Sequence, residues 1–215
     1  HHAGRQTTPD ITGGIQPVCP SATHEGFLNV TPRELSNEEI EDLVQKFVSA
    51  AVRAKMAGID GVELHGAHGY LIGQFMSPHI NKRTDKWGGS TERRMRFPLE
   101  IIRGIREKLG PNFPICFRFN ADDFVEDGID IEEAKKIARI LEDAGVDVLN
   151  VSVGIYEAMP TLLEPFHFEE GWRVYTAEAI KKVVNIPVIT VGVIRDPVLA
   201  DSIIAEGKAD FVAIG

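Results

Sequence analysis

Residues 61–70 read Gly-Val-Glu-Leu-His-Gly-Ala-His-Gly-Tyr, which is a short predicted strand followed at once by polar side chains. The strand covers 61–65, and its last residue, His65, begins a run that also holds a second histidine and a tyrosine. The same arrangement recurs along the chain, because other predicted strands end within one residue of Arg118, Ser152, Gly192 and Gly215. This recurrence indicates a fold that brings the carboxyl ends of several strands to one face.

Helices and strands are predicted to alternate from residue 36 onward. The first helix, 36–57, opens with the capping-box residues Ser36 and Glu39 and then carries apolar residues at helical spacing. Further helices are expected at 90–109, 130–144, 172–184 and 197–206, and strands at 61–65, 114–119, 147–152, 187–191 and 210–214. The strands are short, apolar and rich in β-branched residues, as expected when other elements cover the sheet.

This alternation predicts an α/β fold with a parallel sheet, for which two architectures compete. A doubly wound sheet that binds a dinucleotide would carry a G-x-G-x-x-G turn after its first strand, and the sequence has none. Because active sites of (β/α)8 barrels form at the C-terminal ends of many strands, the TIM barrel is favoured. Such barrels typically need ~250 residues. We therefore expect residues 1–215 to form a single-domain partial barrel without the first two strands and the closing helices.

The composition of the chain limits which binding partners and which cellular compartment are expected. The chain of 215 residues has a formal net charge of −9, which argues against general binding to nucleic acid or to an anionic membrane. The two cysteines, Cys19 and Cys116, form no disulfide framework, so a reducing, cytoplasmic compartment is predicted. No apolar run approaches the ~20 residues of a membrane helix.

The cluster His65, His68 and Tyr70 is the strongest candidate for chemistry. Imidazole N–H groups can hold a carbonyl oxygen, and a phenol can donate a proton to a developing carbanion. The glycines between them allow a sharp turn and close approach to a flat ligand. The alternatives are a metal site or a structural polar cluster. Metal is not favoured, because no third ligand type lies nearby in the sequence.

Long ordered motifs in this region resemble the Old Yellow Enzyme family of NADH:flavin oxidoreductases. The resemblance is carried by 65–78 (HGAHGYLIGQFMSP), 81–90 (NKRTDKWGGS) and 92–97 (ERRMRF), and it extends over the whole chain. It is nearest to the branch of 2-enoate and 2,4-dienoyl-CoA reductases. The resemblance implies a barrel that binds FMN, takes hydride from NAD(P)H and passes it to the activated C=C bond of a small unsaturated carbonyl or carboxyl compound.

The resemblance also assigns roles to individual residues. It places His65 and His68 at the pair that binds the electron-withdrawing oxygen of the substrate, and Tyr70 at the proton donor. It places Arg118 beside the pyrimidine end of the flavin, where a fixed positive charge stabilises the reduced anionic ring. The alternative for Arg118 is an ion pair with Asp122 or Asp123, which lie close in the sequence.

Four further residues complete the predicted site. Gly192 and Gly215 follow the last two strands, where backbone N–H groups commonly bind phosphate, although each glycine can also mark an ordinary turn. Ser152 is expected under the flavin. Tyr156 stands where the dienoyl-CoA reductase branch has an acid/base histidine, so a second proton relay and a pocket-lining role remain equal alternatives.

Other interpretations stay open from the sequence. Six basic residues between 82 and 96 suggest either a phosphate or CoA clamp or, as we prefer, an ion-pair network with Asp85 and Glu92. The chain can also belong to a flavin amine dehydrogenase of the trimethylamine dehydrogenase type, or serve as a flavin-free barrel fragment with a structural role. Relatives suggest a 4Fe-4S cluster and FAD beyond this chain, and a homo-oligomer is compatible with the sequence.

Overall fold

The computed structural model describes residues 2–165 and 167–214, and a five-stranded parallel sheet forms its centre. The strands are β3 (Val62–Gly66), β4 (Ile115–Asn120), β5 (Val148–Ser152), β6 (Val188–Val191) and β7 (Phe211–Ala213). Each strand pairs with the next one along the chain, so the strand order shows no reversal. A doubly wound sheet reverses its order at a switch point, whereas a barrel does not. The predicted barrel-type sheet is therefore confirmed.

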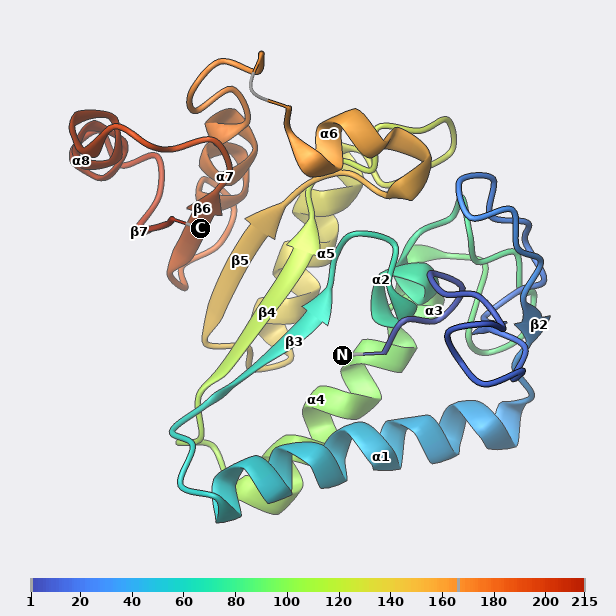
Figure 1. The fold of residues 1–215 in the computed structure, drawn as a ribbon. Helices are drawn as coiled ribbons and strands as arrows, with labels where there is room; N and C mark the ends of the chain where they lie inside the picture. Colours follow the sequence, from blue (N-terminus) through green and yellow to red (C-terminus); the bar gives the residue numbers. More distant parts are fainter. Residues whose placement is uncertain (1, 166, 215) are drawn as a thin grey trace.

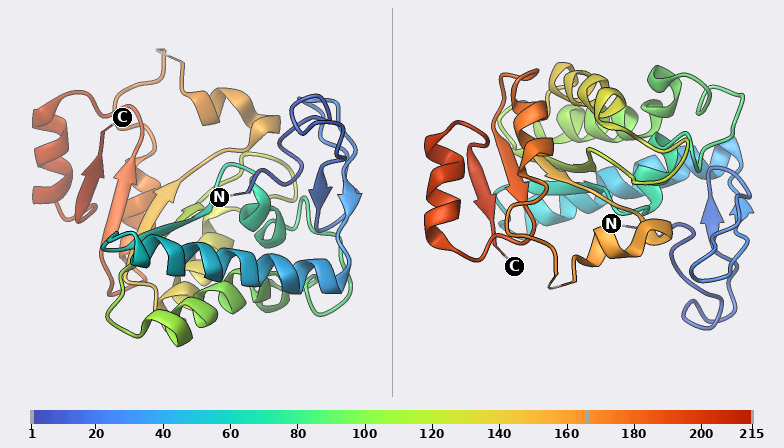
Figure 2. Two further views of the ribbon diagram at one scale, coloured as in Figure 1. Left: turned by 60° about the horizontal axis from the view of Figure 1, so that its bottom comes forward. Right: turned by 90° about the horizontal axis from the view of Figure 1, so that it is seen from above.

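The helices between the strands pack along the outside of the sheet (Figures 1 and 2). They are α1 (Asn37–Met56), α4 (Arg96–Leu109), α5 (Ile131–Asp143), α7 (Val174–Lys181) and α8 (Pro197–Ala205). The predicted capping box at α1 is present, since Ser36 accepts from the Glu39 backbone and the Glu39 side chain accepts from that of Ser36. Asp130 and Asp196 cap α5 and α8 in a similar way.

The two faces of the sheet have different chemistry because side chains alternate along a strand. One face carries fully buried apolar side chains, among them Phe117, Phe119 and Leu149, which pack against the helices in the main core. The opposite face carries His65, Arg118, Asn120, Asn150 and Ser152, as the strand register shows. The helices bury the apolar face, so the inner side of the curved sheet is left for polar chemistry.

Several short elements lie outside the predicted pattern. They are β1 (Val18–Cys19), β2 (Arg33–Glu34), α2 (Leu71–Met76), α3 (Thr91–Arg94), the 3₁₀ turn η1 (Tyr156–Ala158) and α6 (Met159–Leu163). The single helix predicted over 90–109 is wrong in detail, because it divides at Met95 into α3 and α4. The predicted site residue Gly215 lies outside the described residues.

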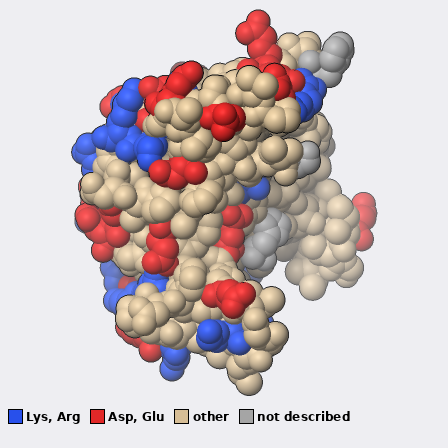
Figure 3. Space-filling model, turned by 90° about the vertical axis from the view of Figure 1, so that its left-hand side faces the viewer, with Lys and Arg blue, Asp and Glu red and all other residues tan. Residues whose placement is uncertain are grey.

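The basic residues between 82 and 96 are largely ion-paired, as preferred from the sequence. Arg83 bonds Asp85 and Glu34, and Lys86 lies 2.6 Å from Glu41. Arg94 pairs with Glu133 of α5, and among the described residues no ion pair is seen for Glu92, which was expected to belong to the network. Acidic and basic side chains are likewise interspersed on the face shown in Figure 3. Among the described helices, none is long and apolar enough to span a membrane.

Candidate active site

The register of the sheet brings the predicted side chains together on its inner face. His65 of β3 is paired with Arg118 of β4, and Asn120 of β4 with Ser152 of β5. Because these positions differ by even numbers along each strand, their side chains share one face. Residues more than thirty positions apart in the sequence, such as Arg118 and Ser152, therefore lie within hydrogen-bond distance of each other. The predicted common site at the strand ends is present for these residues.

The loop after β3 folds the two histidines and the tyrosine into one cluster. The ring centroids of His65 and His68 are 5.1 Å apart, and those of His65 and Tyr70 are 5.3 Å apart. His68 has a left-handed backbone, with φ at 61°, and Gly69 follows at 70°. This reversal turns the chain back over the strand end, so that α2 can start directly after Tyr70.

Both imidazoles are neutral near pH 7. Burial, reinforced by the positive charge of Arg118, lowers the pKa of His65 to about 4. Stronger burial lowers the pKa of His68 to about 3, with Arg118 and His65 adding to the effect. Each ring then carries one N–H and one bare nitrogen, so the pair can donate to an oxygen without holding a positive charge.

Ser152 forms a hydrogen bond with one ring nitrogen of His68 and can favour one tautomer of that ring. The Arg118 Nη2 group donates to Ser152 Oγ at 3.5 Å, and Ser152 Oγ lies 2.7 Å from His68 Nε2. Arginine has only donors, so Oγ accepts from Arg118 and its own hydrogen can point to Nε2. Nε2 then accepts, and the proton of the neutral ring resides on Nδ1. In this arrangement of Arg118, Ser152 and His68, Nδ1–H is the donor of His68.

The phenol of Tyr70 meets that of Tyr156. Their hydroxyl oxygens are 3.0 Å apart, and burial together with this hydrogen bond raises the pKa of Tyr156 to about 12. The two tyrosines line a cavity of about 470 Å³ with His68 and with mostly apolar side chains: Phe27, Met159, Leu162 and Leu163. The geometry thus brings Tyr156, predicted near the substrate, into direct contact with the predicted proton donor.

A buried polar hub supports the His68 turn, and sequence reasoning missed it. Asn120 accepts from the His68 backbone at 3.2 Å and donates to Asp123 and to the Gly154 carbonyl, each at 2.9 Å. Asp123 also accepts from Ser77. The alternative ion pair between Arg118 and Asp123 is therefore wrong, since that carboxylate is engaged elsewhere. The polar run FRFNADD inside an otherwise apolar segment was the available signal.

The N-terminal segment supports the same turn from the other side. Gln74 of α2 donates to the carbonyl oxygens of Gly69, at 2.6 Å, and Ala3, at 3.1 Å. Arg5 is fully buried and forms an ion pair with Glu157, which follows Tyr156 directly. These contacts hold both tyrosine-bearing loops against one segment, and no local sequence pattern announced them.

A second cavity, of about 380 Å³, opens at the end of β6. His68 and Leu162 line it as well as the first cavity, so the two hollows meet there. The far wall is formed by Gly192, with φ at 116°, and by the guanidinium of Arg173. Gly192 therefore lies where it was predicted, on the inner side of the strand ends, while Arg173 was not predicted.

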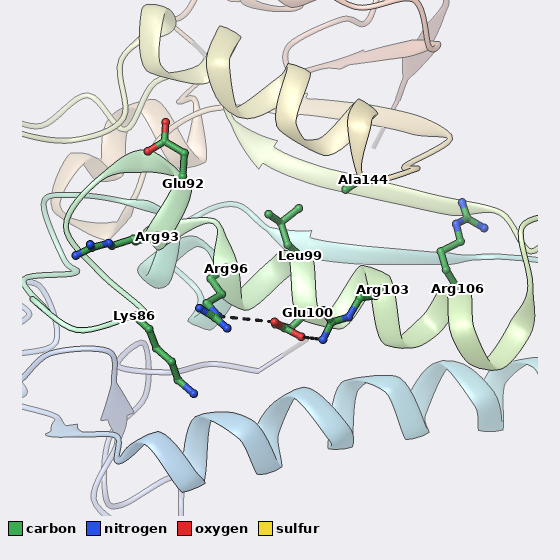
Figure 4. Close-up of a pocket in the computed structure, with 9 residues that line it drawn as sticks. All are labelled: Lys86, Glu92, Arg93, Arg96, Leu99, Glu100, Arg103, Arg106 and Ala144. Carbon is green, nitrogen blue, oxygen red and sulfur yellow. Dashed lines mark hydrogen bonds and ion pairs between the residues drawn. The ribbon is translucent and has the colours of Figure 1, made fainter.

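A larger hollow, of about 570 Å³, lies on the outer helical layer along α4 (Figure 4). Three of its arginines are engaged in ion pairs within the protein: Arg96 and Arg103 flank Glu100, and Arg106 pairs with Asp147. It is remote from the strand ends and holds no part of the histidine cluster. Among the described residues, no group of three or more His, Cys, Asp or Glu side chains could hold a metal ion.

Comparison with known proteins identifies the family. The family model described as the NADH:flavin oxidoreductase / NADH oxidase family matches residues 1–215. The chain belongs to this family. An NADH oxidase of Thermoanaerobacter brockii is 70% identical over 215 residues, which cover 100% of this chain and 33% of that protein.

Solved structures show the same fold relationship. A 2-naphthoyl-CoA reductase in complex with 2-naphthoyl-CoA has a TM-score of 0.92 at 34% identity, covering 99% of this chain and 34% of that one. Histamine dehydrogenase from Rhizobium sp. 4-9 has a TM-score of 0.86 at 29% identity, with coverage of 98% and 31%. The chain thus spans about a third of the length of these relatives.

The residues present fit FMN, the cofactor that family membership implies, with NAD(P)H as reductant. Among the described residues, Arg118 Nε and Arg173 Nη1 are buried without a hydrogen-bond partner. Buried donors of this kind normally meet an acceptor, and both arginines line the same cavity. Arg118 would hold the electron-rich end of the flavin ring, and the backbone at Gly192 would approach the phosphate.

Proposed function

We propose that the protein carrying this chain reduces the activated C=C bond of an α,β-unsaturated carbonyl or carboxyl compound. The observation that carries the proposal is the convergence of a neutral histidine pair and a phenol at one mouth of the sheet. Family membership supports FMN and NAD(P)H as the redox partners. When bound, FMN supplies a hydride that it has received from NAD(P)H.

The histidine pair would polarise the substrate. Nδ1–H of His68 and the N–H of His65 donate to the substrate oxygen, which draws electron density from the alkene and favours hydride addition at the β-carbon. Neutral donors suit this task, because they can strengthen their bonds as negative charge develops on the oxygen. Ser152 and Asn120 act indirectly: Ser152 holds the ring of His68 in place, and Asn120 holds its backbone.

The phenol pair would supply the proton. Tyr70 O–H donates to the α-carbon, where the electron pair of the former double bond arrives, and the product gains one hydride and one proton in total. Tyr156, 3.0 Å away, can then return a proton to the Tyr70 oxygen. The raised pKa of Tyr156 suits a relay that stays protonated between turnovers.

Two other redox reactions have support of their own. The similarity to an NADH oxidase favours dioxygen as electron acceptor, and that to histamine dehydrogenase favours oxidation of an amine. Neither uses a donor pair aimed at a carbonyl oxygen. Moreover, among the described side chains that line the tyrosine cavity, none is a carboxylate that could bind an ammonium group.

The test compares electron acceptors. The full-length enzyme, reduced anaerobically with NADH or NADPH, would be mixed with an enone, an aryl enoate or air-saturated buffer, and the oxidised enzyme would be mixed anaerobically with a histamine-like amine. We expect the unsaturated compounds to reoxidise the flavin fastest and to give the saturated product. Fast reoxidation by dioxygen alone would favour the oxidase, whereas flavin reduction by the amine would favour the dehydrogenase.

Several further properties of the protein are proposed that the fold does not test. These are a phosphate contact at Gly215, kinship with the 2-enoate and 2,4-dienoyl-CoA reductases, and a cytoplasmic enzyme that forms a homo-oligomer. A 4Fe-4S cluster and FAD elsewhere in the full protein belong with them, as does the assignment of residues 1–215 to one domain. Electron paramagnetic resonance and flavin analysis of the full-length protein would test the cofactor content.

A further inference from the structure

Arg173 is a buried cation that the proposed reaction does not use. It precedes α7 and is 4% exposed. Its Nε donates to the Val191 carbonyl at 2.6 Å, and its Nη2 lies 3.1 Å from Glu164 Oε2. Nη1 is buried and has no hydrogen-bond partner among the described residues. Leaving a charged donor buried and unpaired is costly, so this nitrogen is expected to meet an acceptor.

The guanidinium covers the backbone of Gly192. A Cβ atom at Gly192 would lie 2.0 Å from Arg173 Nε and 2.3 Å from Nη2. Gly192 follows β6, in the strand-to-helix connection where barrels of this kind bind phosphate through backbone N–H groups. Glycine at this position therefore does two things: it permits φ at 116°, and it leaves room for a cation directly over the connection.

The charges around the cavity favour an anion. Its lining includes three arginines, Arg118, Arg173 and Arg195, against one carboxylate, Glu164. Arg195 lies at the exposed rim and is already paired with Glu170, and Arg118 sits at the His68 end, where it donates to Ser152. Arg173 is left as the buried cation with a spare donor at the Gly192 end. Burial lowers its pKa, so an additional anionic partner would stabilise its charged form.

We infer that Arg173 binds the phosphate monoester of FMN through Nη1, as a side-chain clamp added to the backbone contacts at Gly192. Glu164 at the end of α6 engages Nη2 and Val191 at the end of β6 engages Nε, so Nη1 is the donor left for a ligand of the cavity that Arg173 lines. The inference rests on FMN as the cofactor, not on the identity of the reduced substrate. Its failure would leave the proposed reduction of C=C bonds untouched.

The test measures flavin affinity in the deflavinated full-length protein by quenching of flavin fluorescence. Arg173→Gln should weaken FMN binding roughly 10- to 100-fold, the effect of losing a hydrogen bond between charged groups. Riboflavin, which lacks the phosphate, should change less than about threefold on the same reasoning. Arg173→Lys should recover part of the FMN affinity, because it restores a positive charge without the fork of donors.

Two controls make the test decisive. Arg106→Gln removes another arginine that pairs with a carboxylate, Asp147, but lies away from the cavity, so it should leave the FMN-to-riboflavin ratio unchanged. Inorganic phosphate should compete with FMN for the wild-type protein and lose that ability in Arg173→Gln. Equal weakening of FMN and riboflavin would overturn the clamp and make Arg173 structural. Phosphate competition that persists in Arg173→Gln would also overturn it, because another group would then hold the phosphate.

Discussion

The two ends of the inner cavity are built in different ways. The catalytic end takes its donors from six consecutive residues, His65 to Tyr70, and its imidazoles are neutral. The Gly192 end is assembled from three separated segments and depends on a buried ion pair between Arg173 and Glu164. The groups proposed to donate to a substrate oxygen are neutral, whereas the end proposed to hold a phosphate contains a buried cation. The two functions should therefore fail separately.

Tyr70→Phe should give the largest effect, and only at the catalytic end. Alkene reduction should slow by ~10²–10⁴-fold, because the α-carbon loses its positioned acid. Flavin reduction by NAD(P)H should hardly change, since that step needs no phenol. Stopped-flow traces of the two half-reactions measure both. Equal slowing of both would make Tyr70 structural, and an unchanged alkene step would point to Tyr156 as the proton source.

Gly192→Ala should damage only the opposite end. The new Cβ would collide with the Arg173 guanidinium and would sit on a backbone with φ at 116°. Strain of about 1–3 kcal/mol predicts a loss of FMN affinity of roughly 5- to 150-fold. Binding of a phenolic ligand to the FMN-saturated variant should stay within about twofold, because strain at Gly192 is remote from His65 and His68. Parallel loss of phenol affinity would show that the two ends are coupled.

Ser152→Ala tests the junction of the two ends with a smaller effect. Loss of the hydroxyl frees His68 Nε2 to take the proton, so the tautomer that donates through Nδ1 is no longer enforced. Phenol binding should weaken by about fivefold, the value of one neutral hydrogen bond. Ser152→Thr, which keeps the hydroxyl, serves as the control. Weakened FMN binding with unchanged phenol binding would instead assign Ser152 to the flavin.

The smallest effect is expected from pH. The pKa values of His65 and His68, about 4 and about 3, predict that phenol affinity varies by less than about twofold between pH 5 and 8. An inflection near pH 6.5 in a binding titration would contradict the neutral pair.

The lowered pKa values of the two histidines also predict the direction in which stability changes with pH. Below pH 6.5 the histidines of the unfolded chain become protonated, whereas the folded His65 stays neutral down to about pH 4. The unfolded state therefore binds more protons, and the free energy of unfolding should fall as the pH is lowered through this range. Melting temperatures measured across this pH range test the prediction. His68→Gln should make the melting temperature depend less steeply on pH.

The alternation of helices and strands was predictable because long periodic segments carry their own signal. The strand predicted at 114–119 lies at Ile115–Asn120, and the helix at 130–144 at Ile131–Asp143. The short elements were not predictable. α2 has six residues and α6 has five, too few for helical periodicity to show, and neither has a side-chain cap.

The cluster of His65, His68 and Tyr70 was predictable because its members are close in sequence and resemble a known family. Arg173 was not, since an arginine at the start of a predicted helix is ordinary, and its partners Glu164 and Val191 lie on other elements. Asn120 and Asp123 lie between these cases. Polar residues directly after an apolar strand hinted at a buried network, but only the strand register shows that it holds His68.

The contact between Arg173 and Gly192 also constrains how this protein can evolve. Any side chain at 192 would occupy the space of the guanidinium, so a residue larger than glycine at 192 is incompatible with arginine at 173. A lineage that acquires a larger residue at 192 must first, or at the same time, give up the arginine at 173. Among homologues the two positions should therefore covary, with a cation supplied from one of them but never with bulk at both.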